Sequence, residues 1–262
     1  MTAPLSGIAV LITRPAQQAA TLAGLIRGLG GKPLLFPAIE IEEIADREIA
    51  GVLERMEAYD LVVFVSPNAA RVAMDCARRL GSTFSRSRLA AIGPGTAAEL
   101  EAAGVGQILM PAEGFDSEAL YRKITLALHG NRRVLLVRGE GGREWLGKTL
   151  REDGVSVEEL ICYRRVKPTA GMESVLPRWL RGDRIACMAT SGQVVENLFE
   201  MAGLAGQPWL RRTPFFVPHA RVARTAFKHG VTSIFVAGVG DPALVRGLET
   251  WYGRKQQAPS SH

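Results

Sequence analysis

The sequence predicts an α/β protein with parallel sheets, because short apolar runs alternate with helical patterns along almost the whole chain. A strand that helices cover on both faces is apolar throughout, rather than at every second residue. Seven runs have this character, at residues 8–12, 61–65, 89–92, 134–137, 185–189, 215–217 and 234–237. Strands of this kind belong in sheets with a layer of helices on each side.

The segments between these runs carry helical spacing and clear helix ends. Apolar residues form one stripe from Ala19 to Leu29 and another from Val72 to Leu80, which Gly81 closes. Asp241 and Pro242 are typical of a helix start, with an N-cap followed by proline in the first turn. After these helices we expect residues 254–262 to form a disordered tail.

The chain also repeats its own pattern. Residues 8–43 read as a strand, a helix closed by glycine and a long extended run, and residues 133–166 read the same way. A looser similarity links residues 61–128 to residues 185–252. The period is too long for a solenoid, so the repetition indicates duplicated domains.

Two domain arrangements fit this repetition. A tandem arrangement divides the chain into residues 1–130 and 131–262. In an interleaved arrangement residues 37–43 and 158–166 cross between domains, so that one domain is 1–36 plus 167–262 and the other is 37–166. Alternation at Ile39, Ile41, Leu160 and Cys162 suits a two-stranded ribbon exposed on one face. The residues by themselves leave both arrangements open.

Composition sets broad limits on location. The chain has 262 residues, 47% of them hydrophobic and 22% charged, which suits two globular domains. No apolar run approaches the roughly 20 residues that span a bilayer, and residues 1–9 lack the pattern of a signal peptide. We therefore expect a cytoplasmic protein with no membrane partner.

The charge favours an anionic ligand. A net charge of +6 and a pI near 9.5 attract anions. The basic residues are scattered and no nucleic-acid-binding motif is present, so a small polyanion is favoured over nucleic acid. Cys76, Cys162 and Cys187 are odd in number and far apart, which indicates half-buried free thiols rather than disulfides. The dispersed histidines give no metal-binding spacing, and no metal or other cofactor is expected.

The turns after the predicted strands are the candidate binding sites. At the carboxyl ends of parallel strands, helix N-termini present free N–H groups that suit carboxylates. Ordinary helix capping explains Ser66 and Thr96 equally well. Arg14 and Arg138 each follow a buried strand, where a salt bridge is the alternative to a ligand contact. The candidates are Arg14, Ser66, Asn68, Gly93, Thr96, Arg138, Gly139, Ser191 and His219.

Six segments in succession resemble the uroporphyrinogen-III synthase family over about residues 8–250. They read LITRP at residues 11–15, FPAIEI at 36–41, VFVSPNA at 63–69, AIGPGTA at 91–97 and VLLVRG at 134–139, followed by Tyr163-Arg164 before Thr190-Ser191-Gly192. No single motif is specific, whereas six in the family's order are. The resemblance implies two doubly wound, flavodoxin-like domains joined by a two-stranded antiparallel linker, which selects the interleaved arrangement.

The resemblance also implies a reaction. The family closes hydroxymethylbilane, a linear tetrapyrrole with eight carboxylates, into uroporphyrinogen III, inverting the last ring through a spiro intermediate and releasing water. No cofactor is needed, because the pyrroles themselves are electron-rich. The protein would fold the substrate so that the wrong ring carbon is out of reach, and would protonate the departing hydroxyl.

Within that resemblance Tyr163 matches the tyrosine on the returning linker strand, and we expect it to be the proton donor. A phenol is protonated at neutral pH and can donate one hydrogen bond. The alternative is a tyrosine that only fills the ribbon. His219 departs from the family, which often has a hydroxyl residue there, so a hydroxyl contact at that turn is in doubt. We expect a monomer. The alternative function is a two-lobed module that binds a tetrapyrrole or another polyanion without catalysis.

Overall fold

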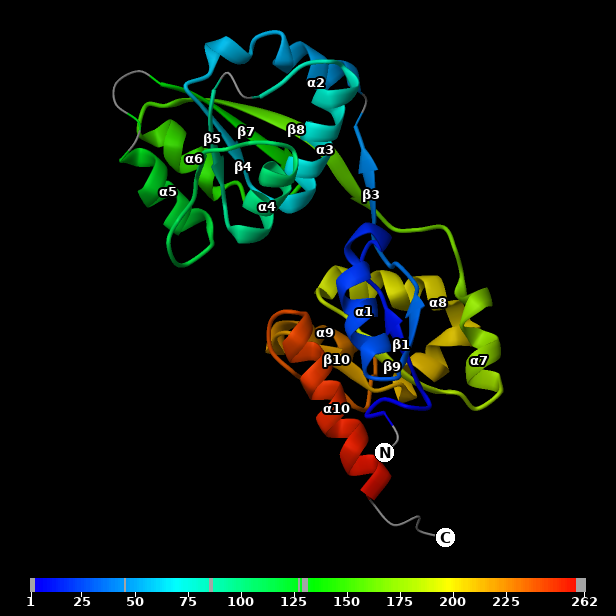
Figure 1. Cartoon of the computed structure of the whole chain (residues 1–262). Helices are drawn as coiled ribbons and strands as arrows, with labels where there is room; N and C mark the ends of the chain where they lie inside the picture. The colour runs from blue at the N-terminus through cyan, green and yellow to red at the C-terminus, as the bar shows by residue number, and fades with distance from the viewer. Residues whose placement is uncertain (1–2, 45, 85–86, 127, 129–131, 258–262) are drawn as a thin grey trace. The chain divides into compact units, whose positions relative to one another are not determined.

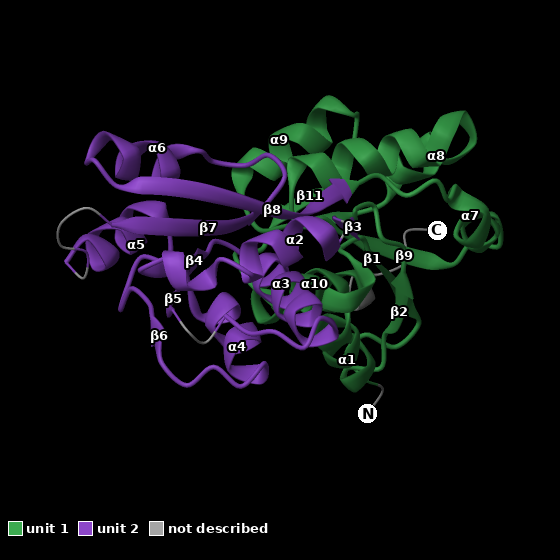
Figure 2. Cartoon of the chain, turned by 90° about the horizontal axis from the view of Figure 1, so that it is seen from above, with its two compact units in different colours: residues 1–40, 166–262 green, residues 41–165 purple. Residues whose placement is uncertain are grey.

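The computed structural model describes residues 3–44, 46–84, 87–126, 128 and 132–257. The chain divides into two compact units, one of Met1–Glu40 with Val166–His262 and one of Ile41–Arg165. Figure 2 colours the two units separately. Each unit has its own sheet and its own core, so each can be described by itself.

Unit 1 is a five-stranded sheet in the order β11-β10-β9-β1-β2, and every pair within it is parallel. Helices α1 and α10 pack against one face, while α7, α8 and α9 pack against the other. The elements are β1 (Ile8–Ile12), α1 (Ala20–Gly28), β2 (Lys32–Leu35), α7 (Leu176–Leu180), β9 (Arg184–Met188), α8 (Gly192–Arg212), β10 (Phe215–Val217), α9 (Ala220–Lys228), β11 (Ile234–Val236) and α10 (Asp241–Gln257).

Unit 2 contains a six-stranded sheet in the order β3-β8-β7-β4-β5-β6. Helices α2, α3 and α4 cover one face, and α5 and α6 cover the other. The elements are β3 (Glu40–Glu43), α2 (Asp46–Leu53), β4 (Leu61–Phe64), α3 (Pro67–Arg79), β5 (Arg88–Ala91), α4 (Pro94–Ala102), β6 (Ile108–Leu109), α5 (Ser117–Thr125), β7 (Arg133–Gly139), α6 (Trp145–Glu152) and β8 (Ser156–Val166).

Each sheet reverses its strand order once. In unit 1 the chain builds from β1 outward to β2, then returns to place β9, β10 and β11 on the other side of β1. In unit 2 the reversal lies between β4 and β7. Helices that follow two such neighbouring strands lie on opposite faces, which leaves a gap at the carboxyl ends of the strands. The predicted doubly wound α/β class is therefore confirmed.

Strand β3 lies beside β8, and Figure 1 shows the two running in opposite directions. The predicted crossing strand 158–166 is not separate: it belongs to β8, which pairs in parallel with β7 from Ser156 to Tyr163. The extended run at residues 33–42 shows the opposite change, because it divides into the two strands β2 and β3. Strand β8 can contact both β3 and β7 because it lies between them in the sheet.

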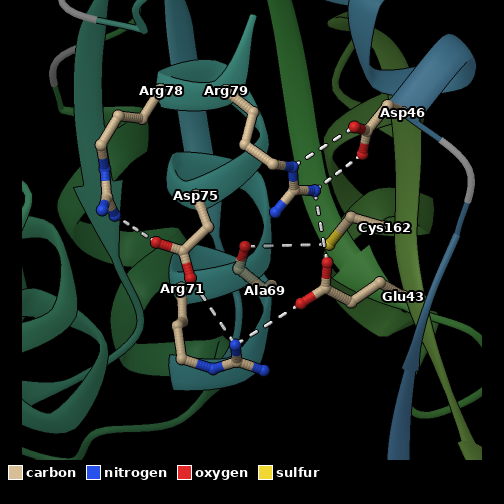
Figure 3. Close-up of polar contacts among 8 residues, drawn as sticks. All are labelled: Glu43, Asp46, Ala69, Arg71, Asp75, Arg78, Arg79 and Cys162. Atoms are coloured by element: carbon tan, nitrogen blue, oxygen red, sulfur yellow. Dashed lines mark hydrogen bonds and ion pairs between the residues drawn. The ribbon is translucent and has the colours of Figure 1, made fainter.

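A network of ion pairs attaches β3 and the start of α2 to α3 (Figure 3). The Arg79 guanidinium lies 2.7 Å from Asp46 and 3.3 Å from Glu43. Arg71 lies 3.6 Å from both Glu43 and Asp75. Single exposed pairs contribute about 0–1 kcal/mol each, but a network that shares partners fixes geometry better than isolated pairs. Strand β3 is therefore held as part of unit 2.

Two further expectations change in the structure. The tail predicted from Arg254 is helical as far as Gln257, because α10 continues with charged residues that favour helix, and residues 258–262 lie outside the described part. The thiols of Cys76, Cys162 and Cys187 are fully buried rather than half-buried. No helix among the described residues is long and apolar enough to cross a membrane.

The burial of the thiols makes a prediction about their reactivity. Burial raises the pKa of Cys162 to about 12 and that of Cys76 to about 11, and it also raises the pKa of Cys187. Since the thiolate is the reactive form, iodoacetamide at about pH 8 should label almost none of them in the native protein. Mass spectrometry after denaturation should find all three labelled. Rapid labelling of any one in the native protein would contradict this assignment.

Candidate functional site

The strand reversal in unit 2 brings together two of the predicted site residues, Ser66 and Gly139. Ser66 follows β4 and caps α3, where its Oγ accepts a hydrogen bond from the Ala69 amide at 3.1 Å. Gly139 is the last residue of the neighbouring strand β7. In doubly wound sheets, ligands bind outside the carboxyl ends of the strands at this reversal. The two residues therefore lie where the topology favours a site.

Tyr163 reaches this site because β8 contains a bulge. Arg138 pairs with Ile161 but Gly139 pairs with Tyr163, so β8 has one extra residue at Cys162. Beyond the bulge, the Glu140 amide donates to the Tyr163 carbonyl oxygen at 2.8 Å. Bulges redirect side chains near binding sites. Here the bulge sets Tyr163 opposite the end of β7 instead of leaving it in the register of the earlier pairs.

The Tyr163 ring lies directly against the backbone of Gly139. A Cβ atom at Gly139 would come within 2.3 Å of the ring, far closer than atoms can approach. Tyr163 is only 1% exposed, so the ring fills this space completely. Gly139 was predicted to bind a ligand, but its first role in the structure is to leave space for the Tyr163 ring.

The Tyr163 hydroxyl joins a small polar cluster. Its Oη lies 3.1 Å from Ser66 Oγ, and either atom can be the donor. Arg165 Nη2 donates to the same Oη at 3.3 Å, and the guanidinium carbon lies 5.8 Å from the ring centroid. Arg165 itself is exposed. The cluster therefore extends from a buried phenol to a positive charge at the surface of unit 2.

The start of α4 supplies a second turn in unit 2. Gly93 is the N-cap, and a Cβ there would lie 2.9 Å from Phe115 Cβ, so glycine permits close packing. Thr96 is 1% exposed inside the first turn, which places it in the interior rather than at the surface. Asn68 lies in the first turn of α3. These N-termini present amide groups and the positive ends of helix dipoles at the same sheet edge as Ser66.

Arg138 is nearly buried, with its side chain 9% exposed, and it has protein partners. Nη1 donates to Glu159 Oε2 at 3.0 Å, and Nη2 donates to the Gly141 carbonyl at 2.6 Å. Burial raises the pKa of Glu159, but the hydrogen bond from Arg151 and the charges of Arg138 and Arg151 outweigh it and hold the pKa below its usual range. Arg138 thus shapes the Gly139–Gly142 turn from within.

The remaining predicted residues lie in unit 1, around its own strand reversal. Buried Thr13 follows β1 and donates through Oγ1 to the Met188 carbonyl of β9 at 2.7 Å. Next to it, Arg14 Nη1 lies 2.7 Å from Asp241 Oδ1, an ion pair that reaches from the end of β1 to the start of α10. Both side chains are 16% exposed, so the pair is largely shielded from water.

Ser191 and His219 both stand at N-cap positions in unit 1. Ser191 Oγ accepts from the Val194 amide at 3.2 Å and so caps α8. His219 begins α9, is exposed, and makes no side-chain capping bond. The imidazole at this turn is therefore available to a ligand in a way that a capping hydroxyl would not be.

Three participants were not predicted from the sequence: Arg165, Glu159 and Asp241. A signal for Arg165 was present, because residues two apart on a strand share a face and Arg165 is two residues after Tyr163. At Asp241 the sequence indicates only a helix cap. Nothing in the sequence indicates that Glu159 pairs with Arg138.

Chemically, the turns of each unit can bind carboxylates, and the Tyr163 cluster can hold or transfer a proton. The described residues contain no group of three or more His, Cys, Asp or Glu side chains arranged to bind a metal. The two arginines nearest the reversals already have carboxylate partners within their own units. The hydrogen-bond donors that could meet a ligand carboxylate are therefore the backbone amides of the turns, together with His219 and Arg165.

The packing of Tyr163 on Gly139 can be tested by Gly139→Ala. The added methyl group must displace the ring, so we expect the free energy of unfolding to fall by about 1–3 kcal/mol in urea titrations. The control is Gly106→Ala, an exposed position where a Cβ meets nothing within 4 Å. Equal stability of the two variants would mean that the ring does not depend on this glycine.

Comparison with known proteins gives one consistent family. The family model described as uroporphyrinogen-III synthase HemD matches residues 20–243. Uroporphyrinogen-III synthase of Salmonella typhimurium is 32% identical over 249 residues, which cover 92% of this chain and 100% of that protein. A putative uroporphyrinogen-III synthase of Methanothermobacter thermautotrophicus is 29% identical and covers 85% of this chain and 90% of its own length.

Solved structures agree on the fold. A mutant uroporphyrinogen III synthase of Thermus thermophilus superimposes with a TM-score of 0.59 at 21% identity, covering 95% of this chain and 99% of that chain. The Helicobacter pylori synthetase gives a TM-score of 0.58 at 13% identity, covering 93% and 99%. Since the family model extends through segments of both compact units, the chain belongs to the uroporphyrinogen-III synthase family.

Proposed function

We propose that this protein is a uroporphyrinogen-III synthase, a cyclizing lyase that converts hydroxymethylbilane to uroporphyrinogen III and water with inversion of the last ring. The observation that carries the proposal is the match to a curated synthase along the whole of that protein's length. The chain's net charge of +6 suits a substrate with eight carboxylates. Fold alone would not be sufficient support, because one fold can host many functions.

In this proposal the substrate carboxylates bind at the strand-to-helix turns. Ser66, Asn68, Gly93, Thr96 and Gly139 mark the turns of unit 2 at which backbone amides and helix N-termini present positive potential. Holding a flexible chain at many points fixes which carbon meets the reactive methylene. That positioning is where most of the catalytic effect would arise, since the uncatalysed ring closure already occurs.

The corresponding residues of unit 1 are Arg14, Ser191 and His219. We propose that His219 donates to a substrate carboxylate, because it is exposed at the start of α9 and makes no capping bond. Arg14 and, in unit 2, Arg138 act through their ion pairs: each holds its turn in place, and a substrate carboxylate would have to share the guanidinium with Asp241 or Glu159.

Tyr163 is the proposed proton donor to the departing hydroxyl. Ser66 Oγ already accepts from the Ala69 amide, so its own proton can be donated to Tyr163 Oη. Arg165 donates to the same oxygen. When Tyr163 Oη accepts both of these hydrogen bonds, its own proton points to a third group, and the substrate hydroxyl can be that acceptor. The same two donors then stabilise the phenolate that remains.

The domain arrangement also belongs to the proposal. We propose two domains, 1–36 plus 167–262 and 37–166, with the chain crossing at residues 37–43 and 158–166; the compact units and the continuous strand β8 support it. The cytoplasmic location, the monomeric state and the lack of a nucleic-acid partner stay predictions from the sequence.

Isomer analysis of the cyclised product tests the function. Hydroxymethylbilane generated in place should yield mainly the type III isomer when the protein is present and the type I isomer in buffer alone, and chromatography of the oxidised porphyrins separates them. The alternative function, a polyanion-binding module without catalysis, predicts binding with no change in the isomer ratio. An unchanged ratio would overturn the proposed activity.

Tyr163→Phe tests the proton donor. Removal of the phenolic hydroxyl should lower kcat by about 10²-fold or more, within the range of general acid catalysis, while far-UV circular dichroism stays unchanged. Tyr121→Phe is the control, because it removes a hydroxyl that bonds Asp153 outside the cluster in the same unit. If Tyr163→Phe keeps full turnover, the tyrosine only fills the space above Gly139.

A further inference from the structure

Unit 1 has a pocket that the proposed reaction does not use. It has a volume of about 510 Å³ and lies between the edge strand β11 and helix α10. This volume falls within the range of small-molecule sites. The lining residues all come from positions 235–255, so the pocket is formed within one unit.

The spacing of α10 explains why this pocket exists. Leu244, Leu248 and Tyr252 are buried against the sheet. Ala243, Gly247 and Trp251 form the adjacent stripe of the helix, at intervals of one turn, and this stripe lines the pocket. A Cβ at Gly247 would lie 2.6 Å from Ala237 Cβ, so glycine lets the helix approach the end of β11 closely. Beyond this contact no further strand of unit 1 covers the stripe, because β11 is the edge of the sheet in the described part of the chain.

The pocket has an aromatic wall. The Phe235 and Trp251 rings lie 6.0 Å apart between centroids, and both contact buried Phe216. Phe235 and Trp251 are each partly exposed. These side chains are fixed by the packing behind them, so the wall is preformed and can accept a flat apolar ligand without rearrangement.

The charge around this wall has a single sign. Arg246, Arg254 and Lys255 line the pocket, and its lining contains no acidic residue among those the structure describes. Within the described part of the chain, no salt bridge involves any of the three. Lys255 Nζ lies 5.1 Å from the centroid of the Trp251 ring, which keeps a cation beside the aromatic wall.

The edge strand adds a backbone donor. Ala237 N donates inward to the Val217 carbonyl, and hydrogen bonds of a parallel strand alternate from side to side. The amide of Val236 therefore points away from β10 at the open edge of the sheet, and Val236 is among the residues that line the pocket. An acidic group of a ligand can receive this N–H together with an arginine.

We propose that the pocket between β11 and α10 is a second binding site, which takes a planar aromatic molecule bearing one or two acidic groups. The ring lies against Phe235 and Trp251, and the acidic group faces Arg246 and Arg254. The volume suits a molecule much smaller than a tetrapyrrole, so this site is distinct from the one proposed for the substrate.

The test uses 2-naphthoate as the probe and its uncharged analogue 2-naphthamide as the matched compound. Titration of the full-length protein, followed by ¹H–¹⁵N NMR, should give saturable shifts at Ala237, Gly247 and Thr250 with a Kd at or below about 1 mM. The amide analogue should bind at least about tenfold more weakly, because it lacks the charge that the basic residues recognise.

Arg246→Glu and Arg254→Glu should each weaken naphthoate binding by about tenfold or more and leave synthase turnover unchanged. Lys228→Glu makes the same change of charge at an exposed position of α9 outside the pocket, and should leave the Kd within about twofold. Equal affinity for the two probes, shifts confined to other residues, or binding that survives both charge reversals would overturn the proposed site.

Discussion

Parallel strands covered on both faces place all the strand-to-helix turns of a sheet on one edge, and the other features of this protein depend on that constraint. The apolar runs that build β1, β4, β7 and β9 have no face left for water, so polar function can appear only after each run ends. The strand reversals then decide which turns become neighbours. Ser66 and Gly139 meet in unit 2 for this reason, as do Thr13 and the end of β9 in unit 1.

Sequence patterns predict the strands and helices well because burial on both faces leaves a strong signal. The runs 8–12 and 215–217 coincide with β1 and β10, and the other five runs differ from the observed strands only at their ends. The continuity of β8 could not be predicted, because an alternating segment looks the same whether it pairs on one side or on two. The helix from Arg254 to Gln257 is not predicted, because its charged helix formers resemble a polar tail.

The candidate site is less accessible to sequence reasoning, because it depends on distances between residues far apart in the chain. Tyr163 and Ser66 could each be selected, but their contact depends on a bulge that has no sequence signature. Arg14 follows β1 as expected, whereas Arg138 lies within β7, and each is neutralised by an acid from another element. A position after a strand identifies a candidate, and only the structure identifies its partner.

The bulge in β8 has a consequence for which sequence changes the protein can tolerate. Beyond the bulge, Tyr163 pairs with Gly139. Loss or gain of one residue between Ile161 and Tyr163 would place a different side chain opposite Gly139. Substitutions along this stretch alter chemistry at one position, whereas an insertion or deletion alters every position after it. In relatives of this chain, the length of that segment should therefore vary less than its composition.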